Sequence, residues 1–326
     1  MIITKTPYRI SFFGGGSDYP EWFSKNYGEV ISTTIDKYIY ITCRELPNFF
    51  SHKYRVVYSN IELVKNIEKI KHNAVKNILL KSKISKGLEI HYDGDLPSRS
   101  GMGSSSCFVV GLLNAINVLQ NKKISKNILA KKSIHLERKI MKENVGLQDQ
   151  IAASYGGFNN ISFNHRGFVV RKIKCSNKFK SQLNKNLLLV YTGVARTAQK
   201  IANTYTGQLK LNKSKNIKEI LSIVDQAKKI ITKGNADDFG DLLNKTWYQK
   251  RQLSKSVSTS NIDEMYNLGI KNGALGGKLL GAGGGGFILF YVKKNHHEKI
   301  KRVFNKSVVL PIELTEKGSE VIFNEK

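Results

Sequence analysis

The stretch that decides the fold is GDLPSRSGMGSSSCFVVGLLNAI, residues 94–116, in which small residues run directly into an apolar segment. The apolar segment predicts a buried helix over residues 106–120. The first N–H groups of a helix have no partner within it, and the helix dipole adds partial positive charge there. Glycine lets the backbone approach a ligand and serine adds hydroxyl donors, as in a phosphate-binding loop. The residues that fit this description are Gly101, Gly103, Ser104, Ser105 and Ser106. An ordinary strand-to-helix turn with a serine cap would have the same composition, so the stretch alone leaves both interpretations open.

Three common nucleotide-site patterns do not account for this loop. The segment GALGGKL, residues 273–279, lacks one spacer residue and the hydroxyl that a P-loop needs. A G-x-G-x-x-G pattern begins at Gly281, but a predicted strand follows it where a dinucleotide-binding motif requires a helix. The chain has no H-R-D segment, which a protein kinase would carry.

Length and composition indicate a folded chain large enough for two domains. The 326 residues are 40% hydrophobic, and no apolar run reaches the ~18 residues of a membrane helix. The opening residues lack a signal-peptide pattern, and three widely spaced cysteines disfavour a disulfide framework, so we expect a cytoplasmic protein. The net charge of +28 comes from basic residues spread along the chain. A biased base composition therefore explains it better than a nucleic-acid surface, and a basic surface would also attract anionic substrates.

The order of the predicted elements indicates a mixed α+β fold. Strands are expected over residues 1–13, 29–43, 55–59, 87–97, 157–163, 167–173, 187–191, 287–292 and 307–313. Helices are expected over residues 61–82, 106–120, 125–142, 147–154, 214–233, 236–258, 261–271 and 296–306. We place the domain boundary so that residues 1–175 form an N-terminal ATP-binding domain and residues 176–326 form a C-terminal domain.

Three separated segments carry a resemblance to a known family. They are TPYRISFFGGGSDYP (residues 6–20), DLPSRSGMGSSSC (residues 95–107) and GKLLGAGGGGFILFY (residues 277–291). In wording, order and spacing they resemble the three motifs of the GHMP kinases, which phosphorylate galactose, homoserine, mevalonate and phosphomevalonate. The resemblance implies an N-terminal domain like ribosomal protein S5 domain 2 and a ferredoxin-like C-terminal domain. It also implies that ATP binds in the cleft between them.

The resemblance assigns the second motif to the ATP phosphates. The residues expected to hold them are Ser100, Gly101, Met102, Gly103, Ser104, Ser105 and Ser106. The family pattern also places Mg²⁺ on Ser105 and Glu137, with Ser104 as the alternative serine, and Mg²⁺ prefers oxygen ligands of this kind. Without the resemblance, Glu137 is typical of a solvated helix carboxylate beside Arg138.

The resemblance also implies a catalytic pair. Asp149 lies where the family carries its catalytic aspartate, about a dozen residues after the metal-binding glutamate, and could accept the proton of the attacking hydroxyl. Arg9 matches the basic residue of the first motif and could stabilise charge on the transferred phosphoryl group and keep Asp149 ionised. The alternative for Asp149 is a helix N-terminal carboxylate stabilised by the helix dipole.

The expected substrate is a sugar. The wording of the first motif most resembles the branch of the family that phosphorylates D-glycero-D-manno-heptose 7-phosphate, together with the related fucokinases. The resemblance therefore implies transfer to the C1 hydroxyl of the heptose 7-phosphate, giving the 1,7-bisphosphate for GDP-heptose and surface polysaccharide. The residues expected to bind the substrate are Gly14, Gly15, Gly16, Ser17, Asp18, Arg196, Lys278, Gly283 and Gly284. Basic candidates for a phosphate on the sugar are Arg196, Lys278, Lys37 and Arg99.

Several alternatives stay open at this stage. One is a fucokinase-like enzyme that acts on an unphosphorylated sugar, and another is a homologue that binds ligands without phosphorylating them. The expected partners are ATP and a sugar phosphate, with no nucleic acid and no membrane. The sequence leaves a homodimer open.

Overall fold

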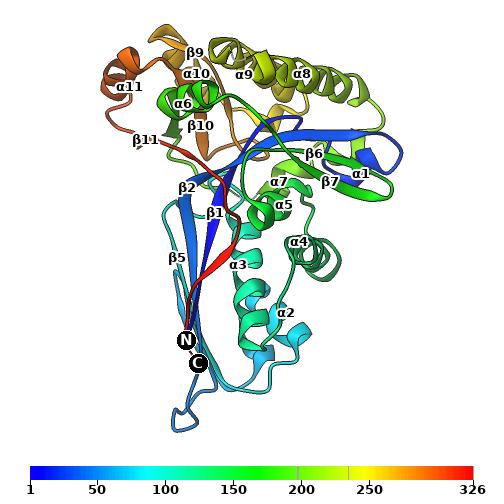
Figure 1. Ribbon diagram of the computed structural model, residues 1–326, viewed down its shortest axis with the longest axis vertical. Helices are drawn as coiled ribbons and strands as arrows, with labels where there is room; N and C mark the ends of the chain where they lie inside the picture. Colours follow the sequence, from blue (N-terminus) through cyan, green and yellow to red (C-terminus); the bar gives the residue numbers. More distant parts are fainter. Residues whose placement is uncertain (197, 234, 326) are drawn as a thin grey trace.

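The computed structural model describes residues 1–196, 198–233 and 235–325, and it contains two β-sheets that lie one above the other in Figure 1. The first is a nine-stranded sheet whose main path has the order β13-β1-β2-β5-β3-β4. Its strands are β1 (Ile2–Phe13), β2 (Gly28–Glu45), β3 (Tyr54–Val57), β4 (Ile61–Val64), β5 (Leu88–Gly94), β6 (Asn159–Asn164), β7 (Gly167–Lys172), β12 (Leu314–Thr315) and β13 (Glu320–Asn324). Strand β2 is long enough to pair with β5 at one end and with β6 at the other.

One face of this sheet is covered by the helix that the opening stretch predicted. Helix α3 (Ser104–Leu119) packs against β1 and β2. It is buried along nearly its whole length, which is why its sequence is apolar on every side instead of striped. The helices around it are α1 (Pro20–Phe23), α2 (Asn73–Ser82), α4 (Lys126–His135), α5 (Gln148–Tyr155) and a π-helical turn, η2 (Leu136–Ile140).

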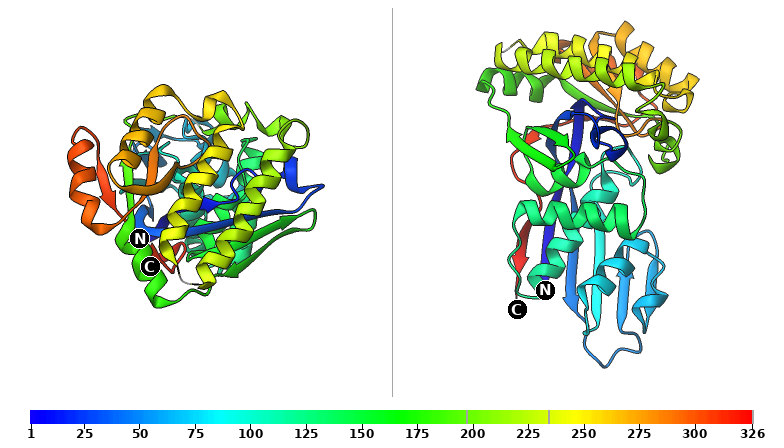
Figure 2. Two further views of the ribbon diagram at one scale, coloured as in Figure 1. Left: turned by 90° about the horizontal axis from the view of Figure 1, so that it is seen from above. Right: turned by 90° about the vertical axis from the view of Figure 1, so that its right-hand side faces the viewer.

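The second sheet has four antiparallel strands in the order β11-β8-β10-β9. They are β8 (Leu187–Tyr191), β9 (Ala274–Leu279), β10 (Phe287–Val292) and β11 (Val309–Pro311). Every position of β10 is buried, so its apolar run is continuous rather than alternating. Helices α8 (Ser214–Lys233) and α9 (Ala236–Arg251) lie side by side over this sheet (Figures 1 and 2). The remaining helices are α6 (Asn177–Asn186), α7 (Ala198–Ala202), α10 (Ser260–Lys271) and α11 (His297–Val303).

The helix expected over residues 61–82 was wrong in its first half. Ile61–Val64 forms strand β4, and helix α2 begins only at Asn73. The apolar side chains of β4 are the exposed ones, with Ile61 63% exposed, whereas Glu62 is buried. Glu62 accepts hydrogen bonds from the backbone N–H groups of Lys71 and His72, which fixes the chain ahead of the helix. A polar residue thus supplies the inward contact where the pattern suggested an apolar one.

The end of the chain returns to the first sheet. Strand β12 pairs with β2 and β13 pairs with β1, so the two termini lie side by side (Figure 1). The last strands therefore belong to the sheet of the N-terminal part, although they lie within the predicted segment 176–326. Division of the chain at residue 175 stays a prediction.

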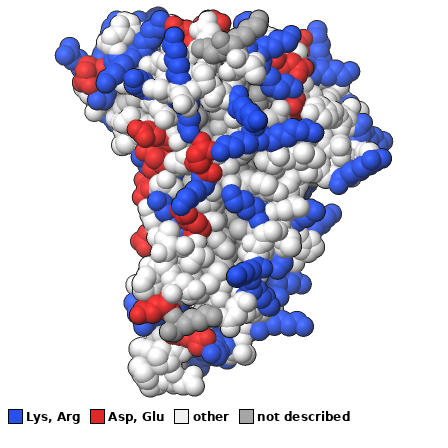
Figure 3. Space-filling view, in the orientation of Figure 1, with Lys and Arg blue, Asp and Glu red and all other residues white. Residues whose placement is uncertain are grey.

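Two surface properties bear on the sequence expectations. Among the described residues, no helix combines the length and apolar character that crossing a membrane would require. In Figure 3, lysine and arginine side chains are spread over the face from top to bottom, with acidic side chains among them. This distribution agrees with the even spread of basic residues along the sequence.

Candidate active site

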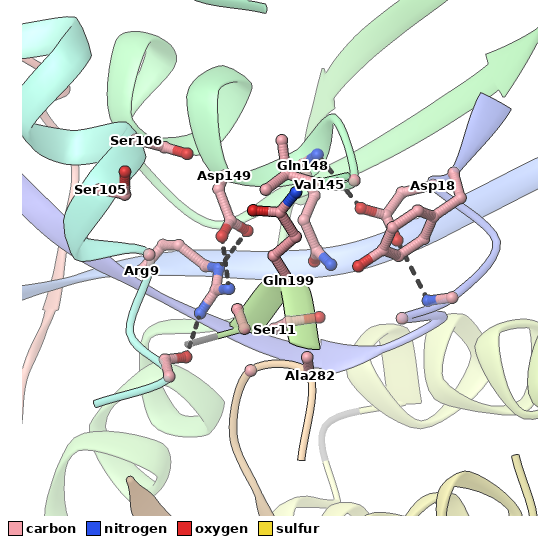
Figure 4. A pocket seen from close by; sticks show the side chains of 18 of the residues that line it. Arg9, Ser11, Asp18, Ser105, Ser106, Val145, Gln148, Asp149, Gln199 and Ala282 are labelled. Carbon is pink, nitrogen blue, oxygen red and sulfur yellow. Dashed lines mark hydrogen bonds and ion pairs between the residues drawn. The ribbon is translucent and has the colours of Figure 1, made fainter. Parts of the chain in front are cut away.

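A cavity of about 310 Å³ lies where the three glycine-containing segments meet (Figure 4). The predicted residues that line it are Arg9, Gly15, Gly16, Asp18, Arg99, Gly101, Gly103, Ser104, Ser105, Ser106, Asp149, Arg196 and Lys278. Other predicted residues lie behind the described lining: Gly14, Ser17, Ser100, Met102, Glu137, Gly283 and Gly284. The fold therefore brings residues from the first half of the chain together with residues from both ends of the second half.

The phosphate loop is held in shape by close backbone contacts. Gly101 and Gly103 have φ angles of +81° and +76°, a conformation that favours glycine. A Cβ atom on Gly101 would lie 2.7 Å from the carbonyl oxygen of Leu280, and one on Gly286 would lie 2.1 Å from that of Ser100. The second and third motifs thus press backbone against backbone, which explains why both are rich in glycine.

The side chains of this loop do not all face the cavity. Met102 is fully buried in the core, so only its backbone is placed to act on a ligand. The Oγ atom of Ser104 accepts a hydrogen bond from the backbone N–H of Arg99, which closes the loop at the start of α3. Ser105 is exposed and lines the cavity, with the N-terminal turn of α3 behind it.

Arg9 and Asp149 form a two-pronged ion pair at the centre of the cavity (Figure 4). The Nε and Nη2 atoms of Arg9 donate to the two carboxylate oxygens of Asp149 at 2.7 and 2.8 Å, and Nη1 donates to the carbonyl oxygen of Gly101 at 2.8 Å. Burial lowers the pKa of Arg9, but the Asp149 charge more than offsets this and the net shift is upward. Each carboxylate oxygen can accept more than one hydrogen bond, so Asp149 retains acceptor sites toward the cavity.

Glu137 is held by a local irregularity of its helix. It lies in the π-helical turn η2, where Met141 N–H donates to the Leu136 carbonyl at 2.8 Å, and such turns are frequent at functional sites. The carboxylate is fully buried and accepts hydrogen bonds from Ser106 Oγ at 2.8 Å and from the Gln150 amide. Burial raises its pKa to about 8. The structure thus places Ser106, and not the expected Ser105, directly against Glu137.

These residues fit a magnesium site built largely on the nucleotide. Glu137 has no lysine or arginine partner among the described residues, so a buried carboxylate is left without a compensating cation. No group of three or more His, Cys, Asp or Glu residues gathers in the described part of the chain. Mg²⁺ commonly takes only one or two protein oxygens and completes its shell with phosphates and water.

The first motif builds a tight turn around Asp18. Gly14 has a φ of +86°, and its missing Cβ would lie 1.9 Å from the Glu29 carbonyl oxygen. Ser17 donates its hydroxyl to the Gly14 carbonyl at 2.7 Å, so these two residues form the turn. Asp18 is fully buried and accepts hydrogen bonds from the N–H groups of Gly16 and Gln148. Burial raises the pKa of Asp18 to about 6, and the nearby Asp149 charge acts in the same direction.

The third motif contributes a buried lysine, Lys278, and a glycine loop that packs against neighbouring residues. Lys278 Nζ donates to the carbonyl oxygens of Ser11 and Phe12 at 2.9 and 2.8 Å, and burial followed by the Arg9 charge lowers its pKa to about 7. Gly283 and Gly284 pack against Val257 and the Arg196 side chain instead of facing the cavity.

The sequence interpretation missed several residues that line the cavity. These are Ser11, Tyr19, Gln148, Tyr205 and Lys250. Ser11, Tyr19 and Gln148 lie inside or beside predicted motifs, so proximity to those motifs was an available signal. Lys250 lies in an amphipathic helix that ends in basic residues, where nothing in the pattern separates a buried lysine from solvated ones.

With this geometry in view, comparisons with known proteins define the class. Residues 62–157 match the model of the GHMP kinases N terminal domain, and residues 217–309 match that of the GHMP kinases C terminal domain. The D-glycero-alpha-D-manno-heptose 7-phosphate kinase of Campylobacter jejuni is 33% identical over 307 residues, which cover 89% of each chain. The bifunctional fucokinase/GDP-fucose pyrophosphorylase of Arabidopsis thaliana is 26% identical over 85% of this chain and 28% of its own length.

A solved structure supports the same fold. The crystal structure of a D-glycero-D-manno-heptose 1-phosphate kinase from Bacteroides thetaiotaomicron has a TM-score of 0.81, with 21% identity and full coverage of both chains. The chain therefore belongs to the GHMP kinase family, with that family's two-domain α+β fold. It is an ATP-dependent phosphotransferase with an alcohol group as acceptor.

Proposed function

We propose that the protein transfers the γ-phosphoryl group of ATP to the C1 hydroxyl of D-glycero-α-D-manno-heptose 7-phosphate. The observation that carries the proposal is the 33% identity to a heptose 7-phosphate kinase over 89% of both chains. The product, a 1,7-bisphosphate, would feed GDP-heptose and surface polysaccharide synthesis. The anomeric hydroxyl is the most acidic hydroxyl of a reducing sugar, so it suits a carboxylate acceptor.

The cavity supports an assignment of roles. The N-terminal turn of α3 and the glycines of the loop would hold the ATP phosphates with backbone N–H groups and serine hydroxyls. Glu137 and Ser106, with Ser105 nearby, would hold Mg²⁺, which when bound neutralises phosphate charge.

The chemical step follows from the central ion pair. The C1 oxygen forms a bond to the γ-phosphorus while the bond to the ADP oxygen breaks. The hydroxyl proton passes to an Asp149 oxygen, and Arg9 holds that carboxylate in position through two hydrogen bonds. Arg9 also reaches the phosphate loop through Gly101, so it lies between the proton acceptor and the expected phosphates. Asp18, held by two backbone N–H groups, would accept hydrogen bonds from sugar hydroxyls.

A coupled ADP-release assay tests the substrate assignment. We expect D-glycero-α-D-manno-heptose 7-phosphate to give the highest kcat/KM among that sugar phosphate, L-fucose, galactose and mevalonate. Phosphorus NMR of the product should show a second phosphate ester on the anomeric carbon. The fucokinase-like relative makes L-fucose the second candidate. Efficient turnover of L-fucose without turnover of the heptose phosphate would overturn the proposal in its favour, and absence of turnover with every acceptor would indicate a ligand-binding homologue.

A further inference from the structure

Arg196 reaches the cavity with an unused guanidinium. Its backbone N–H donates to the Arg99 carbonyl oxygen at 3.3 Å, which ties the loop after β8 to the phosphate loop. Its side chain lies against Gly284, where a Cβ would be 3.1 Å from the arginine Cδ. The Nε and Nη2 atoms are buried and have no hydrogen-bond partner among the described residues. A guanidinium in this state has donors available for a planar or tetrahedral anion.

Lys250 approaches the same cavity from α9. Its Nζ atom is buried and donates to the carbonyl oxygens of Leu279, at 2.8 Å, and Gly281. These two hydrogen bonds leave one of the three ammonium donors available. Gly281 and Gly284 belong to one short loop, so the third motif lies against both cations.

The cavity lining therefore includes basic side chains that no carboxylate pairs with among the described residues. Arg9 is paired with Asp149, but Arg196, Lys250 and Lys278 form no salt bridge with a carboxylate among the described residues. Burial is the main cause that lowers the pKa of Lys250, and the charges of Lys278 and Arg196 lower it further. Unpaired cations in a desolvated site are costly, and the cost falls when an anion binds.

The unpaired guanidinium shares its cavity with Asp18 and with two tyrosines, Tyr19 and Tyr205. Burial lowers the pKa of Arg196 to about 10, and Tyr205 and Tyr19 act in the opposite direction. Tyr19 follows Asp18 directly, and the Tyr19 and Tyr205 rings are 6.2 Å apart, edge to face. The ATP phosphates are expected at the N-terminus of α3.

We propose that Arg196 and Lys250 form a second phosphate site, separate from the α3 N-terminus, that binds the phosphate carried by the sugar substrate. The inference rests on the proposed function, because only a phosphorylated acceptor brings a second anion. Arg196 supplies a fork of donors to a phosphate monoester. Lys250 supplies a point charge, which the carbonyl oxygens of Leu279 and Gly281 hold in position. The site thereby selects sugar phosphates over free sugars.

Three variants and one control test this site. Arg196→Met and Lys250→Met remove each charge, and Arg196→Lys keeps the charge without the fork. Arg251→Met is the matched control, because Arg251 is the next residue of α9 and pairs with Asp263 outside the cavity lining. For each protein, kcat/KM is measured with D-glycero-α-D-manno-heptose 7-phosphate and with the same heptose lacking the phosphate, and KM for ATP is measured separately. Calorimetric titration with the heptose 7-phosphate in the absence of ATP supplies a binding readout.

The expected result is a loss of discrimination. Arg196→Met and Lys250→Met should lower the preference for the phosphorylated sugar by about 10- to 100-fold, the scale of a hydrogen bond to a charged group. KM for ATP should change less than about threefold, and the sugar preference of Arg196→Lys should fall between those of wild type and Arg196→Met.

Other outcomes separate the inference from the proposed function. A raised KM for ATP with unchanged sugar preference would overturn the inference and assign Arg196 to the nucleotide. An unchanged preference with unchanged KM for ATP would also overturn it. If wild type itself prefers an unphosphorylated sugar, the substrate assignment fails first, and that result is visible without any variant.

Discussion

The two ends of the cavity are built in different ways. The phosphate end is made of backbone from one contiguous segment, residues 100–106, pressed against the third glycine motif. The substrate end is made of side chains from separate elements, with Asp18 after β1, Arg196 after β8 and Lys250 in α9. Under the proposed assignment, phosphate recognition would depend on local sequence, whereas sugar recognition would depend on how the two sheets come together.

The largest effect is expected where the two ends meet, at Asp149. Asp149→Asn keeps the size of the side chain but removes the proton acceptor and one partner of Arg9, so kcat should fall between about 10²- and 10⁴-fold. Steady-state kinetics with saturating ATP and sugar measures the change.

Asp241→Asn is the control for this substitution, since Asp241 is exposed on α9 and lies outside the cavity lining. If the Asp149→Asn enzyme turned over at the wild-type rate, another group would have to accept the proton. Asp149 would then not be the group that links the phosphate end of the cavity to the substrate end.

A second prediction compares two glycines of the third motif, of which Gly286 packs against backbone and Gly284 packs against side chains. In Gly286→Ala the new Cβ meets the Ser100 carbonyl oxygen at 2.1 Å, so we expect a loss of about 3–4 kcal/mol in the free energy of unfolding. In Gly284→Ala it meets the movable ends of Arg196 and Ile201 at 3.1 Å, and the loss should be about 1–2 kcal/mol. Urea denaturation measures both.

Gly167→Ala isolates the backbone cost alone. Gly167 has a φ of +126° and no atom within 4 Å of its ideal Cβ position. Equal losses in Gly286→Ala and Gly284→Ala, both matching Gly167→Ala, would show that backbone contact does not hold the phosphate end.

The same contrast explains what the sequence could predict. The fold class, helix α3 and most cavity residues of the three motifs follow from local patterns, because glycine and serine runs carry their own backbone geometry. Lys250 could not be found, since its burial depends on α9 packing over β9. The hydrogen bond between Ser106 and Glu137 could not be predicted, because the π-helical turn that orients Glu137 does not change the apolar spacing of the sequence. The helix expected over residues 61–82 was wrong at its start because the inward residue of β4 is the polar Glu62, whereas the prediction assumed that the apolar residues face inward.

The last prediction concerns the charge of Asp18 at the substrate end. Its folded pKa of about 6 lies above the unfolded value near 3.8, so the folded protein binds the proton more tightly than the unfolded chain. The stability that comes from the protonated form is complete below about pH 4, is lost as pH rises through 6, and does not change further above it. Since one pKa unit corresponds to about 1.4 kcal/mol, Asp18→Asn should gain about 2–3 kcal/mol relative to wild type between pH 4 and pH 7. Urea denaturation across this range measures the difference, with the exposed Asp241→Asn as the control. A flat line for Asp18→Asn would contradict the prediction and would show that the fold holds this carboxylate ionised without cost, compensated by the basic side chains of the same cavity.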